Sequence, residues 1–278
     1  MSKFKDDLQR ISALKKSLIC VGLDPDPDKM PVSDVYEFCK VIVDQTEEFV
    51  TAYKPNLAFF EALGLNGLIA LEKLISYVKT NYPNVLLLGD GKRGDIGDTS
   101  RRYAYAMFNL WDFDAVTVNA FAGFDSIESF LEYRDRGIFV WCKSSNPDGH
   151  QLQDLSINGN NSKKVFQVIA ENCVEWNTND NIGLVVGATY PEELQIVRDI
   201  AEDLPILVPG IGPQMGDLEA SVKAGLAKKN HGLLISSSRG IIYASNEVNM
   251  YGDEARNSSQ ELSKKISNVL DRVGRNFN

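Results

Sequence analysis

The residues best suited to chemistry lie in the stretch Asp90-Gly-Lys-Arg-Gly-Asp95, which follows the apolar run 85–89. Side chains two residues apart on a strand point to the same face, so we expect Asp90 and Lys92 to project together. Asp95 lies just beyond them, where the chain turns into a helix. A lysine held between carboxylates stays protonated and oriented, as a proton donor requires. An ordinary ion pair is the alternative interpretation of this segment taken alone.

Two glycine-bearing loops near the C-terminus are suited to binding an anion. They read Pro209-Gly-Ile-Gly-Pro-Gln214 and Ser236-Ser-Ser-Arg-Gly240. Small residues let backbone N–H groups approach a phosphate closely, and a following helix N-terminus adds a favourable partial charge. Arg239 adds a fork of N–H donors, and the loop that contains Gln214 is a candidate lid. Tight turns are the alternative use of these glycines, but the two loops together favour a phosphate site.

The elements that must position these residues are short apolar runs that alternate with amphipathic stretches. Apolar residues at helical spacing predict helices over 4–14, 32–49 and 65–78, another that starts at 189–192, and a last one through 262–273. Most of the apolar runs are continuous, as in parallel strands that are covered on both faces. Eight strands are predicted, at 17–22, 52–55, 85–89, 115–118, 138–142, 182–186, 206–208 and 232–235.

Eight βα units in 278 residues predict the α/β class and a TIM (β/α)8 barrel with an extra N-terminal helix, as a single domain over 1–278. A doubly wound sheet is the alternative, but no strand-linked GxGxxG fingerprint supports it. The interval 146–162 is rich in Asn, Asp and Gly and is predicted to be a structureless surface loop. Catalytic residues of a barrel lie at the carboxyl ends of its strands. Polar residues fall at these ends: Asp24, Lys54, Asp90, Lys92, Asn119, Ser144, Ser145, Gln214 and Arg239.

Composition narrows the classes of function. The net charge of −9 and the pI near 4.9 argue against general binding to nucleic acid or to anionic membranes. Four cysteines, none in a CxxC pair, are predicted to be buried and reduced, which is typical of a cytosolic protein. The two histidines are expected to be structural or exposed, and no His or Cys cluster predicts a metal site. No signal peptide or transmembrane span is expected.

The chain resembles the orotidine 5'-phosphate decarboxylases, and it is similar to their longer, second type from various bacteria and some protozoa. The resemblance runs over nearly the whole chain, and its most specific piece is Asp90-x-Lys-Arg-Gly-Asp95 with Ile96 and Thr99. The other matching pieces are Val21-Gly-Leu-Asp-Pro25, Tyr53-Lys-Pro-Asn56, Thr117-Val-Asn119, Ser144-Ser-Asn-Pro147, Val186-Gly-Ala-Thr189, Pro209-Gly-Ile-Gly212 and Ser237-Ser-Arg-Gly240.

The resemblance implies an alternating-charge network of Lys54, Asp90, Lys92 and Asp95. Lys92 would protonate the pyrimidine carbon that loses carbon dioxide, and Asp90 would lie beside the departing carboxylate. Asp95, with Ile96 and Thr99, would reach the active site of a neighbouring subunit, which implies a homodimer with shared sites. No pyridoxal-binding or metal-binding pattern is present, so no cofactor is expected and fixed charge must stabilise the carbanion.

The resemblance also implies the residues that bind the substrate. Asp24, Lys54 and Thr99 would contact the ribose, and Ser145 would hydrogen-bond the pyrimidine edge. The phosphate would be held by Gln214, Ser238, Arg239 and backbone N–H groups near Gly240, with Asn56 and Asn119 as supporting residues. The departures from the family pattern are Ser144, where threonine is frequent, and the extended loop 146–162.

Two other functions are alternatives to orotidine 5'-phosphate decarboxylation. In a magnesium-dependent sugar-acid phosphate decarboxylase and in a hexulose phosphate synthase, a similar D-x-K-x-x-D strand holds a metal ion. Arg93-Gly94 and Ser144-Ser-Asn-Pro147 favour the nucleotide enzyme. A phosphate-binding barrel without catalysis is the second rival. A binding module has no need for so costly a charged cluster, which argues against it.

Overall fold

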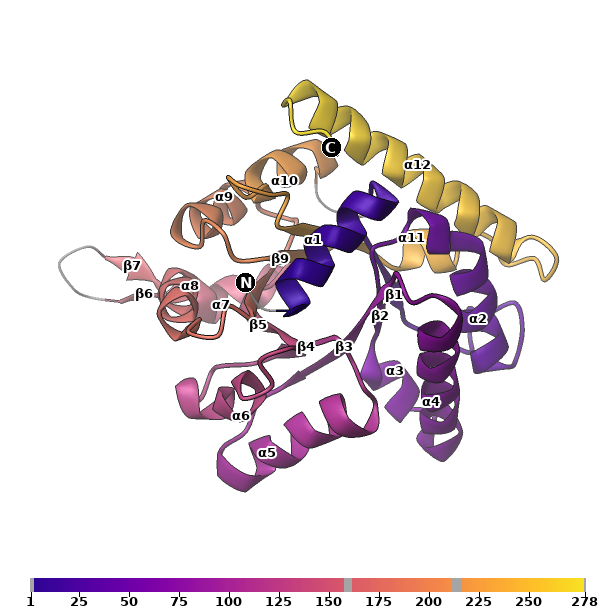
Figure 1. Cartoon of the computed structure of the whole chain (residues 1–278), viewed down its shortest axis with the longest axis horizontal. Coiled ribbons are helices and arrows are strands. Elements are labelled where there is room, and N and C mark those ends of the chain that lie inside the picture. Colours follow the sequence, from indigo (N-terminus) through magenta and orange to yellow (C-terminus); the bar gives the residue numbers. More distant parts are fainter. Residues whose placement is uncertain (1–2, 158–161, 212–216, 278) are drawn as a thin grey trace.

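The computed structural model describes residues 3–157, 162–211 and 217–277. Eight parallel strands form a closed barrel in the order β1-β10-β9-β8-β5-β4-β3-β2 (Figure 1). Each corresponds to a predicted strand, so the prediction of a TIM barrel is confirmed. Their bounds are β1 (Ile19–Leu23), β2 (Ala52–Pro55), β3 (Leu86–Arg93), β4 (Ala115–Val118), β5 (Gly137–Lys143), β8 (Ile182–Val186), β9 (Ile206–Pro209) and β10 (Leu233–Ser237).

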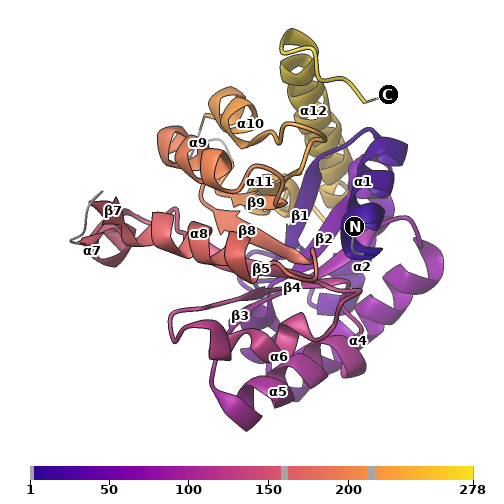
Figure 2. The same ribbon diagram turned by 60° about the vertical axis from the view of Figure 1, so that its left-hand side comes forward.

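Helices surround the strands on the outside of the barrel (Figure 2). The predicted helix 32–49 forms as α2 (Val35–Thr46) and the 3-10 turn η1 (Glu47–Phe49), and it begins late because Asp34 caps it by accepting a hydrogen bond from the backbone of Glu37 at 3.0 Å. The other helices are α3 (Leu57–Glu61), α4 (Gly64–Asn81), α5 (Gly97–Tyr105) with the π turn η2 (Ala106–Leu110), the turn η3 (Phe124–Ser126), α6 (Glu128–Leu131), α8 (Val165–Trp176), α9 (Pro191–Ile200), α10 (Leu218–Gly225), α11 (Arg239–Ile242) and α12 (Tyr251–Arg272).

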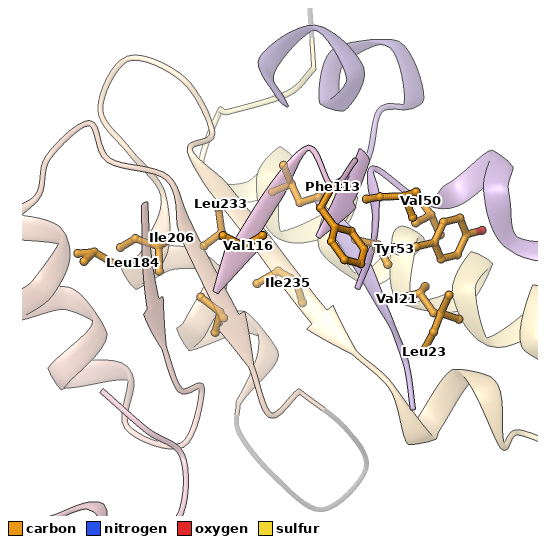
Figure 3. Close-up of a cluster of buried hydrophobic side chains, with 14 of the residues drawn as sticks. Val21, Leu23, Val50, Tyr53, Phe113, Val116, Leu184, Ile206, Leu233 and Ile235 are labelled. Atoms are coloured by element: carbon orange, nitrogen blue, oxygen red, sulfur yellow. The ribbon is translucent and has the colours of Figure 1, made fainter. Parts of the chain in front are cut away.

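Both faces of each strand carry apolar residues, since one face packs against the helices and the other fills the inside of the barrel. Outward residues such as Val21, Tyr53 and Val116 pack in the layer between strands and helices (Figure 3). Inward residues such as Leu88 and Phe139 fill the barrel. The extra N-terminal helix, α1 (Lys3–Lys15), lies across one end of the barrel and adds Phe4, Leu8 and Ile11 to this inner core (Figure 1).

Two strands depart from regular pairing at the carboxyl end of the barrel. In β3 the register with β4 passes from Gly89↔Val116 to Arg93↔Val118, so β3 holds extra residues and runs beyond the predicted end at residue 89. In β5 the register with β8 passes from Trp141↔Val185 to Lys143↔Val186. Such bulges redirect side chains and are frequent beside active sites.

The segment after β5 corrects one prediction. The described part of 146–162 is not structureless, because it contains the 3-10 turn η4 (Pro147–Gly149), α7 (His150–Gln153) and β6 (Ser156–Ile157). The strand β6 pairs antiparallel with β7 (Lys163–Lys164). This excursion projects from the side of the barrel in Figure 1.

The cysteines and histidines lie where their composition and sequence context predict. All four cysteines are buried free thiols, as predicted. His150 is exposed, and His231 is half-buried against the ring of Phe277 at 4.3 Å. Within the described ranges, no helix combines the length and the apolar character that crossing a bilayer requires.

Candidate active site

Three charged side chains meet at the carboxyl ends of β2 and β3. The Lys54 Nζ atom lies 2.5 Å from Asp90 Oδ2, and the Lys92 Nζ atom lies 2.7 Å from Asp90 Oδ1. Lys54 and Asp90 are each only 6% exposed. Asp90 and Lys92 therefore project together, as their spacing predicts, although the chain between them is bulged.

The network fixes the charge state of its buried members. Burial alone would raise the pKa of Asp90, but the ammonium groups of Lys54 and Lys92 outweigh burial and hold that pKa well below its ordinary value. Burial alone would lower the pKa of Lys54, but the carboxylates of Asp90 and Asp24 outweigh it and raise that pKa. Asp90 is thus a carboxylate, and Lys54 an ammonium group, at neutral pH.

Thr117 on β4 connects the network to the backbone, a role that the sequence reasoning missed. Its hydroxyl accepts a hydrogen bond from the backbone N–H of Lys92 at 2.9 Å and donates one to Asp90 Oδ1 at 2.8 Å. Lys92 has a φ of +42°, which is unusual for a residue with a long side chain. The Thr117 hydroxyl therefore stabilises the irregular turn of β3 and orients the Asp90 carboxylate at the same time. Thr117 stands in one of the family-like motifs, which was the only signal for it.

Two adjoining cavities open beside this network, and both are lined by Lys54, Asp90 and Pro209. The wider cavity has a volume of about 660 Å³ and is also lined by Asp24, Asn56, Gly210, Ser238, Arg239 and Gly240. The narrower cavity has a volume of about 190 Å³ and is also lined by Lys92, Thr117, Trp141, Ser144, Ser145 and Asn146. Residues at or just after the carboxyl ends of seven strands, β1 to β5, β9 and β10, thus surround one site.

The wall of the wider cavity carries an acceptor without a partner. Ser238 donates a hydrogen bond to Asp24 Oδ2, whereas Asp24 Oδ1 is buried and accepts no hydrogen bond from the part of the chain that is described. The Tyr243 hydroxyl, which sequence reasoning also missed, donates to the backbone oxygen of Asp24 at 2.6 Å and accepts from the backbone N–H of Asp26 at 2.7 Å. A buried carboxylate oxygen of this kind suits a ligand hydroxyl.

The far end of the wider cavity has the features of an anion site. Arg239 is exposed at the start of α11, and Gly240 follows it. The first N–H groups of a helix have no partner within the helix, so they remain available to an anion. Gly210 has a φ of +96°, which brings the backbone of that loop to the cavity. Gln214 lies outside the described residues.

Several predicted residues are not brought into the cavities of a single chain. Asp95, Ile96 and Thr99 are exposed and line neither cavity, and Asp95 Oδ1 accepts a hydrogen bond from the Ile96 backbone at 2.7 Å. Asn119 also lines neither cavity, and its side chain accepts from the backbone of Phe121 at 3.0 Å. The expectation of a lysine between two carboxylates is therefore not met within one chain, where Asp90 is the only carboxylate that contacts Lys92 among the described residues.

Known proteins match this chain over most of its length. The sequence profile of the Orotidine 5'-phosphate decarboxylase / HUMPS family matches residues 17–252. The chain belongs to this family. It is 43% identical over 271 residues to the orotidine 5'-phosphate decarboxylase of Cupriavidus necator, which covers 95% of this chain and 97% of that protein. It is 44% identical over 248 residues to that of Dechloromonas aromatica, with 87% and 90% covered.

Solved structures of family members have the same barrel. The Leishmania donovani OMP decarboxylase superposes with a TM-score of 0.84 at 39% identity, covering 97% of this chain and 98% of that chain. The Leishmania donovani UMP synthase gives a TM-score of 0.86 at 39% identity, covering 97% of this chain but only 57% of that longer one. The Methanocaldococcus jannaschii enzyme complexed with the inhibitor BMP, at 21% identity and a TM-score of 0.65, supports the fold alone.

Proposed function

We propose that this chain converts orotidine 5'-phosphate to uridine 5'-phosphate and carbon dioxide without a cofactor, with Lys92 as the proton donor. The reaction is that of its family, which it matches over nearly its full length. The observation that carries the mechanism is the ion-paired network in which Lys54 and Asp90 line both cavities and Lys92 lines the narrower one.

The chemical step requires stabilisation of a carbanion. The bond between the ring carbon and the carboxylate breaks, carbon dioxide leaves, and the electron pair stays on the ring carbon. The Lys92 ammonium group, fixed by Asp90, stabilises that developing charge and then donates its proton to the carbon. Lys92 afterwards regains a proton from water. Asp90 would lie beside the departing carboxylate.

The two cavities suit the two halves of the nucleotide. The narrower cavity, with Ser145 at its wall, would hold the pyrimidine beside Lys92. In the wider cavity, Asp24 would accept from the ribose hydroxyls, with Asn56 in support, and Ser238, Arg239 and Gly240 would surround the phosphate. Binding energy from the phosphate, which takes no part in the chemistry, would position the ring.

A homodimer with shared sites would complete the network. Ile96 is 62% exposed, and Phe121, at 86%, is the most exposed of the large apolar side chains among the described residues. They lie on adjoining loops, since the backbone N–H of Asn119 bonds the carbonyl oxygen of Arg93 at 2.8 Å. We propose that this surface pairs with a second copy and presents Asp95, Ile96 and Thr99, with Asn119 behind them, to the partner's site.

The rival metal-dependent chemistry is less compatible with the network. Both oxygens of Asp90 are occupied by lysine ammonium groups, which repel a divalent cation. Within the described residues, no group of three or more His, Cys, Asp or Glu side chains is arranged to hold a metal ion. We also propose a cytosolic location for the chain, which its four buried free thiols support.

The test is the ultraviolet absorbance of orotidine 5'-phosphate incubated with the purified protein and a chelator. We expect conversion to uridine 5'-phosphate by the wild type, and a loss of at least about 10³-fold in kcat for Lys92→Ala. Lys228→Ala, at an exposed lysine paired with Glu202, is the matched control and should keep full activity. A folded wild type that converts only a sugar phosphate with magnesium would overturn the proposal.

A further inference from the structure

The end of β5 carries a buried lysine to which the mechanism assigns no role. Trp141 pairs with Val185, whose side chain lies in the inner core, whereas Lys143 pairs with Val186, whose side chain lies in the outer core. The bulge between these pairs therefore turns the Lys143 ammonium group toward Phe166 in the outer layer, although Lys143 also lines the narrower cavity. It is only 2% exposed, and its ammonium group lies 5.4 Å from the centre of the Phe166 ring.

Two carboxylates from different elements meet this ammonium group. Asp154, which ends α7, places Oδ1 at 2.7 Å from Lys143 Nζ, and Glu193 in the first turn of α9 places Oε2 at 3.4 Å. Lys164 lies beside the same two carboxylates at 3.6 and 3.8 Å. The cluster thus pairs two ammonium groups with two carboxylates, and these carboxylates offset the cost of burying the Lys143 charge.

The residue before Asp154 makes a second attachment to the same strand end. Gln153 Oε1 accepts hydrogen bonds from both the backbone N–H and the hydroxyl of Ser144, each at 2.9 Å. Two consecutive residues of the excursion after β5 are therefore fastened to two consecutive residues at the end of β5. Gly149 allows this approach, because a Cβ atom there would lie 2.4 Å from the Ser144 hydroxyl.

The neighbouring strand encloses Ser145 from the other side. A Cβ atom on Gly187 would lie 2.7 Å from the Ser145 backbone, so only glycine permits the observed packing. Thr189 donates a hydrogen bond to the carbonyl oxygen of Ser145 at 3.1 Å, and the Gly187 N–H donates to that of Lys143 at 2.9 Å. Ser145 thus lies at the wall of the narrower cavity, held between β8 and the excursion.

We propose that Gln153 and Asp154 are positioning residues for catalysis. With Lys143 and Glu193 they form a clamp, hereafter the β5 clamp, that fixes Ser145 where it meets the edge of the pyrimidine. This inference rests on the proposed function, in which Ser145 binds the ring. According to this proposal, the excursion after β5 contributes to recognition of the base and does not contribute to recognition of the phosphate.

Gln153→Ala is the decisive variant, because it removes the attachment without leaving a buried charge. We expect kcat/KM for orotidine 5'-phosphate and the affinity for uridine 5'-phosphate each to fall about tenfold. The affinity for ribose 5-phosphate should be unchanged, because that ligand lacks the base. Gln151→Ala, on the exposed side of the same helix, is the matched control and should behave as wild type. Equal loss of affinity for both ligands would overturn the proposal.

A double-mutant cycle tests whether Gln153 acts through Ser145. In a Ser145→Ala background, Gln153→Ala should cost nothing further in kcat/KM, because the group that it positions is already gone. Losses that add fully would contradict the β5 clamp, since two independent effects would then be at work. Gln153→Glu, which keeps an acceptor for the Ser144 donors, should recover most of the activity.

Hydrogen exchange tests the β5 clamp independently of turnover. Amide exchange in the segment 143–146 should rise in Gln153→Ala and stay at the wild-type rate in Gln151→Ala, because the Ser144 N–H loses its acceptor only in the first. Unchanged exchange in Gln153→Ala would overturn the clamp whatever the activity. An inactive wild type would overturn the proposed function alone, and the exchange rates would still decide the clamp.

Discussion

At the scale of single residues, Asp90 organises the site because it is the one carboxylate that contacts both lysines among the described residues. Lys54 and Lys92 bind different oxygens of the same carboxylate, so each ammonium group is oriented relative to the other. The spacing Asp90-x-Lys92 was sufficient to predict this pair. Thr117 could not be predicted in its role, because its importance comes from a bulge in a neighbouring strand.

The role of Thr117 leads to a prediction about turnover. Thr117→Val keeps the shape of the side chain but leaves the Lys92 N–H without its acceptor and removes a donor from Asp90. We expect kcat to fall about 10- to 100-fold with little change in KM, because the loss affects the orientation of Lys92 more than the binding of substrate.

Thr51→Val is the matched control for this prediction. Thr51 is also fully buried, and its hydroxyl donates to the Ser17 carbonyl oxygen at 2.7 Å, away from both cavities. The thermal stability of Thr51→Val should fall as that of Thr117→Val does, while the kcat of Thr51→Val should be unchanged. Steady-state kinetics and thermal unfolding of both variants decide the matter, and an equal kcat for the two would refute the positioning role.

At the scale of elements, continuous apolar runs were enough to predict every barrel strand. Parallel strands that are covered on both faces bury the side chains of both faces, so their sequences are apolar throughout. The sequence could not predict how the strands end. The run at 85–89 stops at the first charged residue, yet β3 continues to Arg93 because β4 pairs with it across the bulge. The excursion 146–157 was missed because its short polar turns owe their order to Lys143 and Ser144, not to local periodicity.

The packing of α2 against α4 depends on one carboxylate. Asp44 on α2 accepts hydrogen bonds from Lys40 at 2.7 Å, from Tyr77 at 2.7 Å and from Tyr82 at 2.8 Å. Burial alone would raise the pKa of Asp44, but these three hydrogen bonds outweigh burial and hold that pKa below its ordinary value. A carboxyl group with a lowered pKa stabilises the fold above its unfolded-state pKa, and this contribution is lost as the pH falls through the folded-state pKa.

Asp44→Asn should therefore lower the free energy of unfolding by about 1–2 kcal/mol at pH 7. The deficit should begin to shrink as the pH falls below about 4, because the unfolded wild-type chain then binds a proton at Asp44 while the folded carboxyl group resists protonation. Denaturant unfolding of both proteins at pH 7 and pH 3.5 measures this. Asp271→Asn, at an exposed position near the end of α12, serves as the control and should change little at either pH. A deficit that is the same at both pH values would show that charge is not the cause.

At the scale of the whole molecule, one chain forms both cavities but leaves part of the predicted site facing outward. Asp24, Lys54, Asp90 and Lys92 converge, whereas Asp95, Ile96 and Thr99 do not. Residues on strand ends could be placed from the sequence, because the barrel directs every strand end to one rim. The side-chain contacts of Asp95, Ile96 and Thr99 could not be placed in this way, because these residues lie beyond the end of β3 and face outward from the single chain.

We propose that Lys92 of one chain and Asp95 of a second chain act in the same site. Complementation between two variants tests it most directly. Lys92→Ala and Asp95→Ala are purified separately, mixed, dissociated and reassociated, and the turnover of orotidine 5'-phosphate is measured before and after. Each variant alone should be nearly inactive, and the mixture should recover about one quarter of the wild-type activity, since half of the dimers are mixed and one of their two sites is intact. No recovery in mixed dimers of verified size, or full activity of either variant alone, would show that Lys92 and Asp95 of different chains do not share an active site.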